Sequence, residues 1–308
     1  MEQIRRMRGG AQAHLMRCSD GNYYVVKFQN NPQHRRILVN ELLGTRLASR
    51  MGLPTVPVGA VEVSEELIRL TPELCIETPR TRIPCRAGLQ FGSRYPGDPR
   101  RVTLHDFLPD EKLREVDNLH DFAGMLAFDK WTCNTNGRQT VFFETPCRAS
   151  EGTAPGETTR GTTKSATGRT GGSSAGGAGG IPAGGSADAG PAAYHTVMID
   201  QGFCFNAGEW NFPDAPLRGL YARNRVYEGV MGMESFAPWL ERLEKQISEL
   251  VLAELAGEIP PAWYEDDYDA LLRLLEQIHG RRARVGELLV SAKKSNRQPF
   301  PYWREGVV

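Results

Sequence analysis

The sequence lacks an excess of charge of either sign. Its 308 residues hold 37 Lys and Arg against 37 Asp and Glu, so the formal net charge is zero. Proteins that bind nucleic acids or anionic membranes through their overall charge carry a basic excess. We therefore expect neither a nucleic-acid partner nor a membrane partner.

Long apolar runs and paired cysteines are missing too. No run approaches the roughly 18 apolar residues of a membrane-spanning helix, and the opening MEQIRRMRGG has no apolar signal-peptide core. The six cysteines are scattered without a C-x-x-C pair, which argues against a zinc site or a disulfide framework. Together these absences predict a cytoplasmic protein.

A lysine stands inside an apolar segment. Residues 23–28, YYVVKF, are aromatic and β-branched and follow an Asp-Gly turn, so they predict a strand. Burial of Lys27 in this strand is costly unless its ammonium group meets an anion. A helix predicted over 33–51 carries Glu41 on its otherwise apolar side. We expect Lys27 to meet the Glu41 carboxylate, a ligand phosphate, or both.

A glycine pair precedes this strand. Gly9 and Gly10 lie in MRGGAQAHLM, ahead of a strand predicted to begin at residue 14. Glycine lets the backbone approach a ligand closely, and a hairpin tip can present several N–H groups to phosphates. Such a pair is usually an ordinary turn. The neighbouring Lys27 favours a phosphate-binding turn.

The rest of the chain changes from β-rich to mainly helical. Strands are predicted over 54–63, 66–70, 85–93 and 194–200 and at the end of 134–144. Helices are predicted near 117–132 and 234–256, with another starting at 263–265 and a last one ending near 294. Residues 145–193 are mostly Gly, Ala, Ser, Thr and Pro, with no aromatic residue until Tyr194. This composition predicts a disordered insert at 146–193 within a hairpin. The whole pattern predicts an α+β, bilobal protein.

An acidic residue ends the last predicted strand. Asp200 is followed by Gln201 and Gly202, a D-x-G sequence typical of a turn that holds a metal-binding carboxylate. The motif is common. It gains specificity here because it follows a strand lysine, a helical glutamate and a polar loop at NTNGRQ.

These segments carry a family resemblance. MRGGAQAHLM, YYVVKFQNNPQ, LVNELLGTRLA, FGSRYP, FDKWTCNTNGRQTVFF and VMIDQGFCF together resemble the HipA-like kinases and, more distantly, the phosphoinositide-kinase-like folds. The resemblance implies a kinase N-lobe over 1–92, a C-lobe over 93–308, and use of ATP and Mg²⁺. By this resemblance Gly9, Gly10 and Gln12 belong to a phosphate loop, and Lys27 contacts the ATP phosphates and pairs with Glu41. Leu89 and Gln90 lie at the adenine hinge, and Asp200 binds magnesium.

The catalytic loop departs from the family pattern. Asn136 stands where N-x-D would place the catalytic aspartate, and Val141 stands where a magnesium-binding asparagine is expected. An amide can orient a hydroxyl group but cannot accept its proton. Arg138 and Gln139 are candidates for charge neutralisation and metal binding. Asp129 has the D-x-x-x-x-N spacing to Asn134 that a catalytic role would need, although we favour a structural role for it on the preceding helix.

Three functions remain open from the sequence. The first is an ATP- and Mg²⁺-dependent kinase, acting on a Ser or Thr hydroxyl of an unknown protein and weakened by Asn136. The second is a pseudokinase that binds nucleotide as a regulatory module. The third is a two-lobed protein whose charges form ordinary surface pairs.

Deletion of residues 146–193 is expected to leave the fold and the melting temperature essentially unchanged. Their composition offers too little apolar surface to offset the entropy of ordering them. Thermal unfolding of the deletion variant beside the full chain measures this. A large fall in melting temperature would contradict the prediction.

Overall fold

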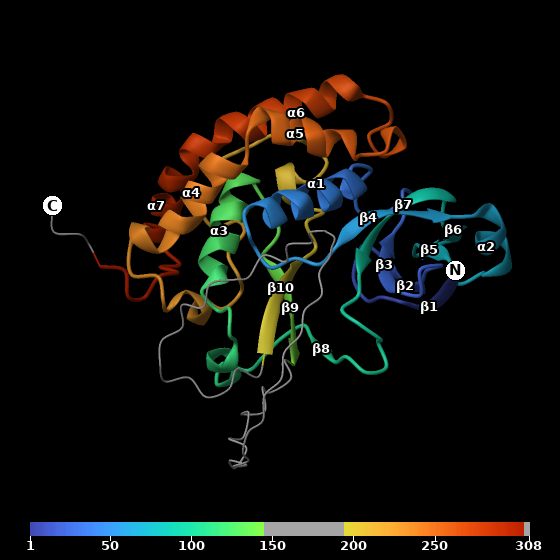
Figure 1. Cartoon of the computed structure of the whole chain (residues 1–308), viewed down its shortest axis with the longest axis horizontal. Helices are drawn as coiled ribbons and strands as arrows, with labels where there is room; N and C mark the ends of the chain where they lie inside the picture. Colours follow the sequence, from blue (N-terminus) through green and yellow to red (C-terminus); the bar gives the residue numbers. More distant parts are fainter. Residues whose placement is uncertain (145–193, 305–308) are drawn as a thin grey trace, which may run out of the picture.

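The computed structural model describes residues 1–144 and 194–304. The chain forms a β-rich N-terminal part and a mainly helical C-terminal part, which Figure 1 shows side by side. This confirms the predicted α+β, bilobal class. The predicted boundary at 92/93 stays a prediction, and the insert predicted at 146–193 lies outside the described residues.

The N-terminal part is built on one antiparallel sheet. Its strands run in the order β1-β2-β3-β7-β4, with bounds Glu2–Arg6, His14–Arg17, Tyr23–Lys27, Gly88–Arg94 and Val58–Val63. A hairpin of β5 (Cys75–Glu77) and β6 (Arg82–Pro84) contributes to a small core on one face of this sheet. Because side chains alternate along a strand, the buried Val26 of β3 faces this core while Lys27 faces the opposite way.

One predicted strand is wrong. Residues 66–70 belong to helix α2, Glu65–Leu70. The Ser64 hydroxyl accepts a hydrogen bond from the Leu67 backbone N–H at 3.2 Å, and Glu65 and Glu66 occupy the first turn. An N-cap serine followed by acidic residues favours a helix start, and this local chemistry outweighs the apolar alternation.

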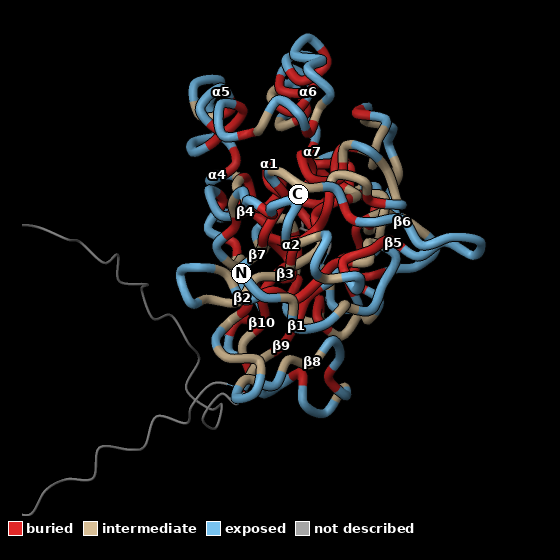
Figure 2. The backbone as a smooth tube through the Cα atoms, turned by 90° about the vertical axis from the view of Figure 1, so that its right-hand side faces the viewer, coloured by how far each residue is buried: buried red, intermediate tan, exposed pale blue. Residues whose placement is uncertain are grey.

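Helix α1, Ile37–Arg50, lies between the two parts of the molecule. It contacts β4 and β7 on one side and α5 (Glu249–Gly257) on the other. Eleven of its residues are buried, including the polar Asn40 and Glu41. Figure 2 shows the buried stretches gathered around this helix. A helix buried on nearly all sides is a fixed element, which suits it to hold a site.

The C-terminal part contains a second antiparallel sheet. Its order is β10-β9-β8, with bounds Tyr194–Ile199, Gln139–Glu144 and Leu104–His105. Tyr194 pairs with Glu144 and Ile199 pairs with Gln139, so β9 and β10 are hairpin partners as predicted. The Met198 N–H also donates to the Pro54 carbonyl at 2.8 Å. That bond ties β10 to the segment that follows α1.

Helix α3, Asp121–Trp131, contacts α4 (Ala237–Gln246) and α7 (Val285–Lys293). Helix α6 (Tyr268–Arg281) packs beside α5, and the two lie above α1 in Figure 1. The single helix predicted over 234–256 is in fact two, because Ser248 caps α5 by accepting the Val251 N–H at 3.3 Å. Among the helices described, none has the length and apolar character that crossing a membrane requires.

Gly124→Ala is expected to destabilise the protein. A Cβ at Gly124 in α3 would lie 2.4 Å from the Trp239 ring of α4. Overpacking of this kind costs roughly 1–3 kcal/mol, which exceeds the roughly 1 kcal/mol that alanine gains over glycine in a helix. Denaturant unfolding measures the net change.

Gly280→Ala is the matched control for this substitution. Gly280 is also helical, in α6, and its added Cβ would meet no atom within 4 Å. This variant should be slightly stabilised. If both variants were equally stabilised, the helix contact at Gly124 would be looser than the structure shows.

Candidate active site

Lys27 connects three elements that are far apart in the sequence. It ends β3, and its ammonium group donates to Glu41 of α1 and, at 2.7 Å, to Asp200 Oδ1 just after β10. Lys27 is 8% exposed and Glu41 is 2% exposed. In such surroundings an ion pair is strong and an unpaired charge is costly. The arrangement therefore fixes β3, α1 and β10 relative to one another.

The pKa values of the three charged groups in this cluster are shifted in different directions. Burial lowers the pKa of Lys27, but Glu41 and Asp200 outweigh it and raise that pKa. Burial raises the pKa of Glu41 above its usual value despite Lys27, whereas Lys27 overcomes burial at Asp200 and lowers its pKa. Two carboxylates share one ammonium group. A cation brought to Asp200 would therefore relieve the repulsion between the carboxylates.

Glu41 also holds the turn after β10. Its Oε2 accepts the Gln201 N–H at 3.0 Å, and its Oε1 accepts the Gly202 N–H at 2.9 Å. A Cβ at Gly202 would lie 2.7 Å from Ile37 and 2.9 Å from the Glu41 carboxylate. The glycine of the D-x-G motif is thus needed for close approach to α1. Asp200 itself takes the left-handed conformation, with φ of +60°.

Asn40, the residue before Glu41 in α1, binds the backbone carbonyls of the segment that follows Gln201. Its Nδ2 lies 2.9 Å from the Gly202 carbonyl and 2.8 Å from those of Cys204 and Ala207. The Trp210 indole N–H donates to Asn40 Oδ1 at 2.8 Å. The sequence interpretation missed this residue. The sequence does show a polar side chain next to Glu41 in an otherwise apolar helix. A buried amide there needs hydrogen-bond partners, and this requirement could have identified Asn40.

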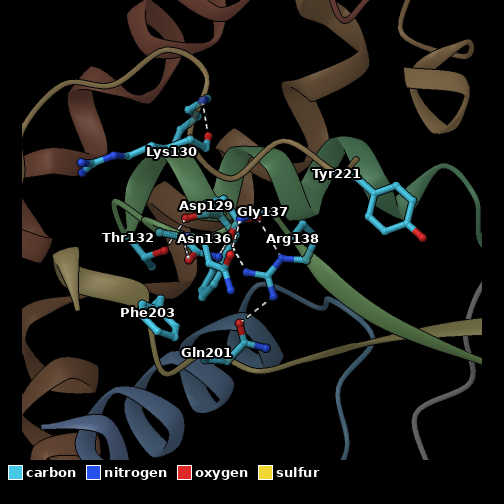
Figure 3. A network of polar contacts seen from close by, with 12 residues as sticks. Asp129, Lys130, Thr132, Asn136, Gly137, Arg138, Gln201, Phe203 and Tyr221 are labelled. Carbon is cyan, nitrogen blue, oxygen red and sulfur yellow. Dashed lines mark hydrogen bonds and ion pairs between the residues drawn. The ribbon is translucent and has the colours of Figure 1, made fainter. Parts of the chain in front are cut away.

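A second buried network lies beneath the loop at 132–138 (Figure 3). The Asp129 carboxylate accepts two bonds from the Arg138 guanidinium, one of them at 2.8 Å, and one from Asn134 Nδ2 at 2.9 Å. Arg138 also donates to Gln201 Oε1 at 2.8 Å and to the Ile199 carbonyl at 3.1 Å. Arg138 thus connects α3 directly to the turn that contains Asp200.

This network decides how Asp129 and Arg138 can act. Their side chains are 0% and 1% exposed, and both Asp129 oxygens are already bonded. A group enclosed in this way does not touch a substrate hydroxyl. The geometry therefore favours the structural alternative for Asp129 and gives Arg138 a structural role as well. Direct catalytic roles for this pair stay predictions.

Asn136 and Gln139 lie nearer the surface. Asn136 is half-buried, and its N–H donates to Asn134 Oδ1 at 3.1 Å, as in an Asn turn. Its own Oδ1 accepts the Gly137 N–H at 2.9 Å. Gln139 is exposed and begins β9 opposite Ile199, one residue before Asp200 in that strand pair. Gln139 therefore lies beside the end of β10, next to the turn at Asp200, and Asn136 precedes Gln139 by three residues. Their catalytic and metal-binding roles stay predictions.

The segment after Asp200 is held against α3 and the loop that follows it. Thr135 N–H donates to the Phe203 carbonyl at 3.1 Å, and Phe205 N–H donates to the Thr132 carbonyl at 2.6 Å. Farther along, Lys130 Nζ donates to the Pro216 and Arg218 carbonyls at 2.6 and 2.5 Å. Burial lowers the pKa of Lys130 to about 8. These bonds fix the backbone after Asp200 at Phe203, Phe205, Pro216 and Arg218.

The glycine pair lies in the loop between β1 and β2. Gly9 has φ of +113°, and Asn31 Nδ2 holds the Ala11 carbonyl at 3.0 Å. The described residues provide no acceptor for the backbone N–H groups of Gly9, Gly10 and Ala11. The Gln12 side chain, by contrast, exchanges two 2.7 Å bonds with the Glu77 backbone. The loop can present backbone donors, but Gln12 is engaged elsewhere.

Leu89 and Gln90 are not at the connection between the two parts. They lie in the first half of β7, and the chain leaves this strand only after Arg94. The Leu89 carbonyl accepts from Trp263 Nε1 at 2.8 Å, and the Gln90 side chain bonds to Gln29 N–H and to carbonyls of residues 86–88. The Leu89 carbonyl and the Gln90 side chain are thus already bonded, and the adenine-hinge role of these residues stays a prediction.

The described residues contain no cluster of three or more His, Cys, Asp or Glu side chains that could hold a metal by themselves. Magnesium is usually held by one or two carboxylates together with phosphates and water. Asp200, with Gln139 nearby, fits that donor set, since one Asp200 oxygen already bonds Lys27 and the other is not used by it. The side chains present are therefore compatible with a metal that arrives together with phosphate.

The family of HipA-like kinases matches residues 1–141, which confirms the resemblance for that stretch and supports a kinase-like function. The solved structures of a Golgi casein kinase, one of them with Mn/ADP bound, are 10% identical. Their TM-scores are 0.44 and 0.43, and each match covers 96% of this chain and 74% of the other. No curated protein matches the chain.

Asp129→Asn is expected to destabilise the fold. It would leave the buried Arg138 charge without its counter-ion, and breaking one partner of a buried pair costs roughly 3–5 kcal/mol. Denaturant unfolding measures the loss. Glu241→Gln is the control because it breaks an ion pair with Lys245 that is more than half exposed, and stability should hardly change. Equal stability of Asp129→Asn and the native chain would contradict the structural role.

Proposed function

We propose that the protein is an ATP- and Mg²⁺-dependent kinase that transfers phosphate to a Ser or Thr hydroxyl of a protein substrate. The convergence of Lys27, Glu41 and Asp200 from β3, α1 and the end of β10 carries this proposal. The match of residues 1–141 to HipA-like kinases supports it independently. Phosphoryl transfer needs phosphates held and their charge neutralised, and these residues supply both functions.

Each residue has a role that its geometry permits. Lys27 would neutralise phosphate oxygens, and Glu41 would keep the ammonium group in place. The free N–H groups of Gly9, Gly10 and Ala11 would donate to the same phosphates, as consecutive backbone donors do. Asp200, assisted by Gln139, would hold Mg²⁺, which supplies positive charge at the transferred group.

The acceptor side of the site lacks an evident base. Asn136 is an amide, and the nearby Asp129 is enclosed by Arg138 and Asn134. General-base catalysis typically contributes about 100-fold or more, but phosphoryl transfer is largely dissociative and proceeds without it at a lower rate. We therefore propose a slow kinase in which Asn136 orients the acceptor hydroxyl.

One observation favours a second candidate, a nucleotide-binding pseudokinase with a regulatory role. Val141 is buried within β9 opposite Val197, so this position offers no metal ligand. Together with Asn136, it removes two polar groups that a catalytic loop would use. Nucleotide binding through Lys27 and Asp200 would persist without turnover.

Asn136→Asp is expected to raise ATP turnover by about 100-fold, because a carboxylate can accept the proton that the amide cannot.

Asp200→Ala should abolish the dependence on Mg²⁺. Phosphate transfer and ATP hydrolysis by the purified chain with Mg²⁺ or Mn²⁺ measure both effects.

The native chain decides between the two candidates. Turnover that disappears in Asp200→Ala identifies a working kinase. Nucleotide binding without turnover, with activity appearing in Asn136→Asp, identifies the pseudokinase. Nucleotide binding that responds normally to Mg²⁺ in Asp200→Ala would remove this residue from the metal site.

A further inference from the structure

The loop between β1 and β2, residues 7–13, lies at the Lys27 end of β3, and we call it the glycine loop. His14 pairs with Val26 in the β2–β3 register, so the loop begins one residue beyond this pair, level with Lys27. The backbone N–H groups of residues 9–11 find no acceptor in the part of the chain that the structure describes. The position of the glycine loop therefore decides where these donors lie relative to the Lys27 ammonium group.

The turn that follows β3 holds the glycine loop at one place. Asn31 Nδ2 donates to the Ala11 carbonyl at 3.0 Å, and Asn31 Oδ1 accepts the Gln33 N–H at 3.0 Å. A Cβ at Gly10 would lie 3.0 Å from Gln33 Nε2, so the loop backbone packs directly against that side chain. These contacts tie the loop to the segment between β3 and α1.

A second contact joins the glycine loop to the β5–β6 hairpin. The Gln12 carboxamide donates to the Glu77 carbonyl and accepts the Glu77 N–H, both at 2.7 Å. Backbone groups of alternate residues in an antiparallel pair point away from the partner strand. Because the Thr78 N–H donates to the Thr81 carbonyl at 2.8 Å, the neighbouring Glu77 directs its backbone groups away from β6. Gln12 therefore pairs with the free edge of β5 as a strand residue would.

The backbone of Gln12 has a conformation that is unfavourable for a residue with a side chain. Its φ is +47°, in the left-handed region, and its N–H donates to the Gly9 carbonyl at 3.2 Å. Residues other than glycine adopt this conformation at a cost and keep it where surrounding contacts hold them. The two bonds to Glu77 are such contacts. The hairpin thus holds the turn at 9–12 in its shape.

The hairpin is itself fixed to the sheet. The Glu77 carboxylate pairs with Arg6 at 2.5 Å and with Arg82 of β6 at 3.2 Å. Arg6, the last residue of β1, also donates to the Cys75 carbonyl at 3.3 Å. Ile76 of β5 is 3% exposed and belongs to the small core on one face of the sheet. A hairpin held in this way can support a loop that would otherwise move.

We propose that Gln12 is a positioning residue for the phosphate site, acting by fixing the glycine loop to the β5–β6 hairpin. This inference rests on the kinase function proposed above. In this role Gln12 leaves the phosphates to the loop backbone, because its own side-chain oxygen and nitrogen bond to Glu77. A loop that is already in place loses less conformational freedom when phosphate binds, and the affinity for the nucleotide is higher for that reason.

Calorimetric titration with adenylyl imidodiphosphate, a non-hydrolysable ATP analogue, in the presence of Mg²⁺ and beside adenosine tests this role. Gln12→Met keeps the size of the side chain but removes both bonds, and Gln12→Gly also relieves the left-handed φ. Both variants should bind the analogue about tenfold more weakly than the native chain, since the two bonds that support the loop are lost. Adenosine binding should not change, because adenosine carries no phosphate. A merely structural role would leave the ratio of the two affinities unchanged.

Arg82→Gln is the matched control. It removes the 3.2 Å ion pair of the Glu77 carboxylate but leaves the Glu77 backbone groups that Gln12 binds. This variant should bind the analogue like the native chain. Native affinity in either Gln12 variant, a parallel loss of adenosine binding, or an equal loss in Arg82→Gln would each overturn the proposal.

Amide hydrogen exchange in the ligand-free chain separates this inference from the proposed function. The N–H groups of residues 7 and 12 donate to the carbonyls of Ala13, at 2.7 Å, and of Gly9. Both should exchange faster in Gln12→Met than in the native chain, because the loop opens more often without its support. Equal exchange would overturn the support by the hairpin whether or not nucleotide binds. Faster exchange in a chain that binds no analogue would instead overturn the kinase function, and the phosphate role of the loop with it.

Discussion

The buried ammonium group of Lys27 is the constraint on which the rest of the site depends. An isolated charge at this depth would cost several kcal/mol, so β3 can carry it only if carboxylates reach it. Glu41 comes from α1 and Asp200 from the end of β10. The ammonium nitrogen of Lys27 therefore links the N-terminal part, through β3 and α1, to the C-terminal part at Asp200. Any ligand phosphate would compete with these carboxylates for the same donor.

Helix α1 turns that pairing into a rigid support. Glu41 and Asn40 are consecutive, and they bind the turn at 201–202 and the carbonyls that follow it. Because Gly202 packs directly on Ile37 and Glu41, movement of α1 would shift Asp200 with it. A change in α1 position would consequently alter both the cation and the carboxylate that the proposed nucleotide site needs.

The carboxylate of Asp129 shows how the same residue type can serve a different purpose. Its bonds to Arg138 and Asn134 connect α3, the loop at 132–138 and the turn after β10. The loop is held in place by this ion pair, while its exposed side presents Asn136. The loop therefore has a rigid frame, and both proposed functions, the slow kinase and the pseudokinase, place an amide that cannot act as a base on this frame.

The sequence by itself determined the local elements and the identity of the charged residues. Strand β3, helix α1, the β9–β10 pair and the roles open to Lys27 and Glu41 follow from apolar patterning and the cost of burying charge. It failed where competing local signals were close, as at α2, where Ser64 capping prevailed, and at Ile247, where one helix became two.

Only the tertiary structure decided which polar groups meet. The enclosure of Asp129 by Arg138, the three carbonyls held by Asn40 and the engagement of Gln12 and Gln90 all depend on partners remote in sequence. Spacing along the chain carries no information on such meetings, because they are fixed by strand register and helix packing.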